Sequence, residues 1–153
     1  MQRLFAAIAV LATIGAIAVS DASAGAIQVS GVQEPTGVEG VSTMTGDLVG
    51  KWYDTTPLEE FVAGLRVHPS GTIQITGTEL FDGCLGAICG TLSFEYHAEL
   101  KLVAPDYVEL IFGRCQHTVT GGTGGFAGAT GVLTFRDDPE TGCSYYKGHI
   151  KLP

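Results

Sequence analysis

The feature that most constrains this chain is the alternation of apolar and polar residues with a period of two. It is clearest over residues 91–103, where the even positions from Leu92 to Leu102 are apolar and the odd positions through Lys101 are polar. Because successive side chains of a strand point to opposite faces, this pattern predicts a long strand with one buried and one solvated face. Residues 61–68 and 144–152 alternate in the same way.

Further strands are predicted over residues 43–54, 72–80, 107–116 and 130–136, with a weaker one over 27–32, which makes seven or eight in all. Short connectors rich in Gly, Pro and Asp separate most of them, and short connectors favour antiparallel hairpins. They are Pro69-Ser70-Gly71, Asp82-Gly83, Ala104-Pro105-Asp106 and the segment 137–142. Helical turns are expected only at 58–61 or 124–127. An up-and-down barrel or a sandwich fits, and the barrel is favoured because closure leaves no exposed edges.

The N-terminal segment has the pattern of a secretory signal peptide. Arg3 precedes an apolar run from Leu4 to Val19, and Ala22-x-Ala24 fits the small-residue cleavage rule. The alternative is a transmembrane anchor, but the run is short for a hydrocarbon core about 30 Å thick. We therefore expect a secreted protein with no membrane span in the mature chain. Its domains are the signal (1–24), a flexible segment (25–42) and the barrel (43–153).

The four cysteines, Cys84, Cys89, Cys115 and Cys143, predict two disulfides in an exported protein. Three pairings are possible. A hairpin end would bring the first two within bridging range, which leaves Cys115 to pair with Cys143. The alternative is a zinc site with Cys115-x-His117 as one half. The four histidines are too scattered for the usual ligand spacing, so no metal is expected.

Composition and motifs exclude several classes of function. Eight Lys and Arg residues against sixteen Asp and Glu leave no basic face for nucleic acid. The chain has no Asn, which excludes N-glycosylation, and no Gly-x-Ser-x-Gly elbow for hydrolase chemistry. Residues 121–131 hold six glycines, but they lack the Lys of a phosphate loop and the βαβ setting of a dinucleotide site. No cofactor is therefore expected, and the glycines predict a close crossing of strands anchored by Phe126.

This glycine segment also resembles the signature loop of dirigent proteins and allene-oxide-cyclase-like barrels. The pattern Gly-Gly-Thr-Gly-x-Phe-x-x-Ala-x-Gly is matched by Gly121, Gly122, Thr123, Gly124, Phe126, Ala129 and Gly131. The resemblance implies an eight-stranded antiparallel barrel with an apolar cavity, often assembled as a trimer. Dirigent proteins steer radical coupling, and the cyclases close a ring in a fatty-acid epoxide. The cyclase's Asn has no counterpart in this chain.

Strand parity supplies candidate residues for a ligand cavity. In the predicted alternation, Glu79 lies on the same face of its strand as Ile73 and Ile75. Arg114 likewise lies on the same face as Leu110 and Phe112. A buried charge must be paired, so an interior Glu79–Arg114 pair is one hypothesis. The other places both at strand ends in solvent. The aromatic candidates for the cavity wall, which could equally be plain core, are Tyr96, Phe112 and Tyr146.

Three functions remain open from the sequence. The first is a secreted, non-catalytic barrel that binds a small neutral, apolar molecule or a partner. The second is an isomerase or cyclase of the allene-oxide-cyclase type, and the third a structural envelope protein. The net charge of −8 disfavours anionic ligands. The predicted interior is strongly apolar, which favours binding; its members are Leu92, Phe94, Leu110, Phe112, Leu133, Phe135 and Ile150.

Overall fold

The structure is a computed structural model that describes residues 25–103 and 109–153. The predicted signal segment, the whole of the predicted turn at 104–106 and the start of the strand predicted over 107–116 lie outside the described residues.

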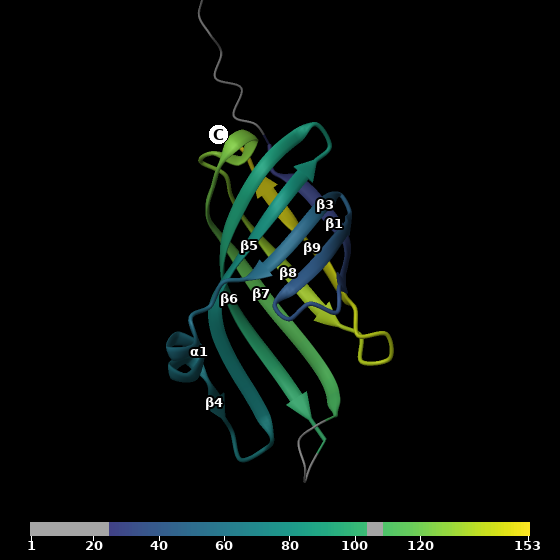
Figure 1. Ribbon diagram of the computed structural model, residues 1–153, viewed down its shortest axis with the longest axis vertical. Coiled ribbons are helices and arrows are strands. Elements are labelled where there is room, and N and C mark those ends of the chain that lie inside the picture. The colour runs from purple at the N-terminus through teal and green to yellow at the C-terminus, as the bar shows by residue number, and fades with distance from the viewer. Residues whose placement is uncertain (1–24, 104–108) are drawn as a thin grey trace, which may run out of the picture.

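Eight strands form a closed antiparallel barrel, as predicted (Figure 1). Each strand pairs with the next along the chain, and the pairings β3–β5 and β9–β1 close the ring. The strands are β1 (Ile27–Pro35), β2 (Val41–Gly46), β3 (Leu48–Asp54), β5 (Thr72–Leu85), β6 (Ile88–Leu102), β7 (Leu110–Gly122), β8 (Thr130–Asp137) and β9 (Ser144–Lys151). The predicted strand 43–54 is divided between β2 and β3. β5 continues through Asp82-Gly83, a predicted turn, and the chain turns after Leu85.

Between β3 and β5 the chain leaves the barrel wall, which corrects the strand predicted over residues 61–68. It forms the short helix α1 (Leu58–Gly64) and the two-residue strand β4 (Arg66–Val67), which pairs with β5 outside the ring. Glu59 and Glu60 lie in the first turn of α1, where acidic side chains favour the positive end of the helix dipole. The helix and β4 lie beside the lower end of β5 (Figure 1).

The segment 25–42, expected to be flexible apart from the weakly predicted strand over 27–32, contributes strand β1 to the barrel. β1 pairs with β2 on one side and with β9 on the other, so the ring closes only through it. Its inner face explains the weak signal in the sequence. Val29 is buried, but Gly31 takes the next inward position, where the Tyr146 ring leaves no room for a side chain. Gln33 follows, so the apolar alternation breaks off after Val29.

Strand β7 presents the opposite face to the interior from the one predicted. Its inward residues are Gly113, Cys115, His117 and Val119, whereas Phe112 and Arg114 face outward. The cause is a register irregularity. Leu110 pairs with Leu102 but Phe112 pairs with Lys101, so the intervening residue Ile111 is extra and shifts the alternation by one position. The alternation counted from Leu110 therefore assigns the residues that follow Ile111 to the wrong face of the strand.

The middle of the barrel is packed with large side chains. Trp52 stacks on Phe94 with ring centroids 4.7 Å apart, and its ring lies 5.1 Å from that of Phe135. Of the predicted interior set, Leu92, Phe94, Leu133, Phe135 and Ile150 are confirmed. The other fully buried large side chains are Met44, Leu48, Trp52, Phe81 and Phe126.

The glycine segment closes one end of the barrel, in agreement with its structural interpretation. It leads into a 3-10 turn over Gly124–Phe126, and the Phe126 ring is fully buried 6.3 Å from that of Phe81. A Cβ on Gly122 would lie 2.4 Å from the carbonyl oxygen of Phe126. Gly124 has φ +58°, a conformation that residues with a side chain rarely adopt.

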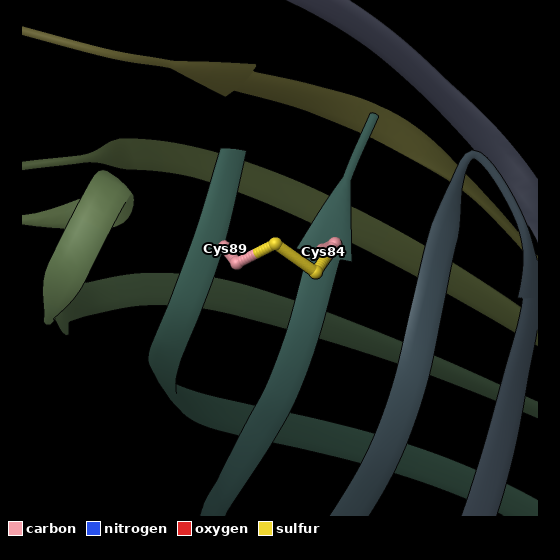
Figure 2. The surroundings of a disulfide bond; sticks show 2 residues. All are labelled: Cys84 and Cys89. Atoms are coloured by element: carbon pink, nitrogen blue, oxygen red, sulfur yellow. A yellow bond between two sulfur atoms is a disulfide. The ribbon is translucent and has the colours of Figure 1, made fainter. Parts of the chain in front are cut away.

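One of the two predicted disulfides is confirmed. Cys84 and Cys89 are bonded across the β5–β6 hairpin, with Cα atoms 4.1 Å apart (Figure 2). Cys115 and Cys143 are free, which corrects the second pairing. Cys115 lies on β7 opposite Phe135 of β8, whereas Cys143 lies beyond the turn that follows β8. β8 therefore runs between the two cysteines.

We predict that Gly122→Ala destabilises the protein and that Gly121→Ala does not. The first methyl group would overlap the backbone of Phe126, and such overpacking costs about 1–3 kcal/mol. The second would meet nothing within 4 Å, which makes it a matched control. Thermal or urea unfolding of both variants measures the difference, and equal stability of the two would show that the loop is not tightly packed.

Candidate functional site

The five predicted cavity residues lie in two separate places, inside the barrel and on its outer wall. Glu79 faces the interior, as one of the two hypotheses held, but its partner is His117 and not Arg114. The His117 Nε2 atom donates a hydrogen bond of 2.5 Å to the Glu79 carboxylate. The His117 side chain is only 5% exposed, and that of Glu79 16%. Arg114 lies on the other face of β7, so the predicted Glu79–Arg114 pair does not form.

Aromatic rings enclose His117. The ring centroids of Phe135 and Trp52 lie 4.5 and 5.3 Å from that of His117, and Tyr96 lies 5.6 Å away. Within the described residues, neither His117 Nδ1 nor Trp52 Nε1 has a hydrogen-bond partner. Parity reasoning missed His117 because it is set on the inward face by the irregularity at Ile111.

The thiol of Cys115 adjoins this pair, with its sulfur 3.6 Å from His117 Nε2. Burial raises the pKa of Cys115, and the nearby Glu79 and Asp137 carboxylates raise it further. The thiolate is the nucleophilic form of cysteine, so these surroundings hold Cys115 in its unreactive form.

The two predicted cavity tyrosines are built into the barrel. The Tyr146 hydroxyl accepts a hydrogen bond from the Leu48 amide at 2.9 Å and donates to the Thr45 carbonyl at 3.1 Å. It thereby fixes the β2–β3 turn. Burial raises the pKa of Tyr96, an effect that the Thr56 hydroxyl partly offsets.

Outside the barrel, a groove of about 560 Å³ lies over β7, β8 and β9. Phe112 and Arg114 enter it from β7, Thr134 and Arg136 from β8. Its full lining is Phe112, Gly113, Arg114, Thr134, Phe135, Arg136, Tyr145, Tyr146 and Lys147. Sequence reasoning missed Arg136, Tyr145 and Lys147 as site residues. The sequence does contain a signal for them. All three alternate with apolar residues of two consecutive strands, β8 and β9, and therefore face outward.

The groove combines positive charge with exposed aromatic surface. Arg114 donates a 2.7 Å hydrogen bond to the Glu99 carboxylate of β6. Arg136 lies directly opposite Arg114 across the β7–β8 pair. Within the described ranges, neither Arg136 nor Lys147 makes an ion pair. Tyr145 is 52% exposed and Phe112 38%.

No protein-family model, curated protein or solved structure matches this chain. The resemblance to dirigent and allene-oxide-cyclase-like barrels therefore stays a prediction. Over residues 25–103 and 109–153, no helix is both long enough and apolar enough to cross a membrane. The same residues hold no cluster of three or more side chains suited to a metal ion.

We predict that Cys115 is alkylated slowly in the folded protein. Because burial and the two carboxylates raise its pKa, the thiolate fraction at mildly alkaline pH is smaller than for an ordinary thiol. Iodoacetamide labelling followed by peptide mass mapping measures the rate, with the same site in denaturant as control. A native rate equal to the denatured one would contradict the packing of β7.

Proposed function

We propose that this protein is an exported, non-catalytic binding protein whose ligand is a small molecule with a flat apolar part. We place the binding site in the outer groove over β7–β9. The observation that carries the proposal is the contrast between a barrel interior packed with fully buried side chains and a groove that exposes two aromatic rings.

The interior offers little support for the ligand site predicted there. An eight-stranded barrel is just wide enough for its own side chains or one small ligand. Here the rings of Trp52, Phe94 and Phe135 meet in the centre, and Phe126 plugs one end. A ligand in the middle of the barrel would have to displace these rings.

The groove has the properties of a small-molecule site. Its volume of about 560 Å³ lies within the usual range of ligand pockets. Phe112 and Tyr145 offer flat apolar surface, and three cationic side chains and the Thr134 hydroxyl are available to orient a ligand.

Two further observations support the remaining parts of the proposal. The Cys84–Cys89 disulfide suits an oxidising compartment, as does the predicted signal segment. Glu79 and His117 could serve as an acid–base pair in the alternative function, an isomerase. However, aromatic rings enclose His117, and burial raises the pKa of Cys115, which favours binding over catalysis.

The test is a fluorescence titration with N-phenylnaphthylamine, a neutral, flat, apolar probe. We predict that the probe binds and that Tyr145→Ala weakens binding about fivefold or more, because an aromatic contact and its buried area are lost. The matched control is Tyr53→Ala, which removes a tyrosine from β3 on the opposite side of the ring of strands. Phe112→Ala should act like Tyr145→Ala.

Absence of binding, or equal weakening by Tyr53→Ala and Tyr145→Ala, would contradict the proposal. Absence of binding would leave the structural envelope function as the better account.

A further inference from the structure

The groove gathers positive charge on a protein that is acidic overall. The chain has eight Lys and Arg residues against sixteen Asp and Glu, yet Arg114, Arg136 and Lys147 line this one groove. All three side chains project from the outer faces of neighbouring strands of the barrel. Charge is thus concentrated where the proposed ligand would lie.

The pairing register places two of these cations directly opposite each other. Arg114 and Arg136 are cross-strand partners, and like charges in that position destabilise a sheet. On β9, Tyr145 lies opposite Arg136, and Lys147 lies opposite Thr134. Glu99 offsets the charge of Arg114 from the β6 side, but no carboxylate among the described residues does so for Arg136. An anion between the two guanidinium groups would remove the repulsion.

We propose that the ligand of the groove is an aromatic anion, a flat ring that carries a carboxylate or sulfonate group. The ring packs on Phe112 and Tyr145, and the anionic group lies among Arg114, Arg136 and Lys147. Guanidinium groups present planar N–H donors that match such oxygen atoms, and hydrogen bonds between charged partners are about twice as strong as neutral ones. This inference rests on the proposed function and adds the charge of the ligand to it.

The net charge of −8 does not oppose this assignment at contact distance. Exposed charges more than about 10 Å apart are largely screened at an ionic strength of 0.1 M. Short-range attraction in the groove therefore outweighs the repulsion from carboxylates elsewhere on the barrel. The total charge of the chain favours a neutral ligand, whereas the distribution of that charge over the surface favours an anionic one.

Glu99 competes with the ligand for Arg114. Its carboxylate accepts the 2.7 Å hydrogen bond from Arg114, so a bound anion must share or displace that contact. Arg136 makes no such contact within the described part of the chain and is therefore the stronger anion-binding residue of the two. Replacing Glu99 with Gln should strengthen anion binding.

The test compares two probes that share one ring skeleton. Anilinonaphthalene sulfonate carries an anionic group, whereas N-phenylnaphthylamine is neutral. We predict that the sulfonate binds about tenfold more tightly at an ionic strength of about 0.1 M and that Arg136→Gln removes this advantage. The matched control is Lys51→Gln, which removes the same charge from β3 on the opposite side of the ring of strands. Glu99→Gln should tighten sulfonate binding and leave the neutral probe unchanged.

Salt gives an independent readout on the unmodified protein. Raising the ionic strength to about 1 M, where the Debye length is about 3 Å, should reduce the sulfonate's advantage and not weaken the neutral probe.

The outcomes separate this inference from the proposed function. If both probes bind equally and Tyr145→Ala weakens both, the groove binds ligands but the assignment of an anion is wrong. If neither probe binds, the proposed function fails. If Lys51→Gln and Arg136→Gln reduce sulfonate binding equally, the effect is one of total charge and the inference is overturned. Thermal melting of each variant shows that it is folded.

Discussion

The packing of a single indole ring holds the barrel together across its centre. Trp52 projects from β3 and meets Phe94 of β6, His117 of β7 and Phe135 of β8. These strands belong to different parts of the wall, so the indole joins sides of the barrel that share no backbone hydrogen bonds with β3. Large buried aromatic side chains contribute several kcal/mol each to the free energy of unfolding, about 3–5 kcal/mol when truncated to Ala.

These rings occupy the centre of the barrel and surround its buried histidine. Glu79 and His117 share one hydrogen bond inside the barrel, and the Tyr146 hydroxyl holds the β2–β3 turn. We propose that ligands bind to the outer wall instead. There β7, β8 and β9 bring two aromatic rings and three cations together, and we propose that an anionic ligand offsets the like-charged pair Arg114–Arg136.

The fold was predictable where the alternation of apolar and polar side chains shows which face of a strand is buried. The alternation from Leu92 to Leu102 predicted the longest strand, and short polar connectors predicted antiparallel pairing. Features set by neighbouring strands were not predictable. The irregularity at Ile111 depends on how β7 pairs with β6, and it turned Phe112 and Arg114 to the outer face. β1 was obscured because Gly31 occupies an inward position that Tyr146 fills from across the sheet. For the same reason the site residues Phe112 and Arg114 were found but were assigned to the wrong face, and the partner of Glu79 was missed.

The barrel interior is filled, and we propose that ligands bind on its outer wall. Trp52 is the only tryptophan of the chain, so its indole N–H gives one signal from the core in a ¹H–¹⁵N correlation spectrum. We predict that titration with anilinonaphthalene sulfonate shifts the amide signals of β8 and β9 around Arg136 and Tyr145 and leaves the Trp52 indole signal in place. A large shift of the Trp52 signal, with the outer residues of β8 and β9 unchanged, would place the ligand inside the barrel and contradict the claim.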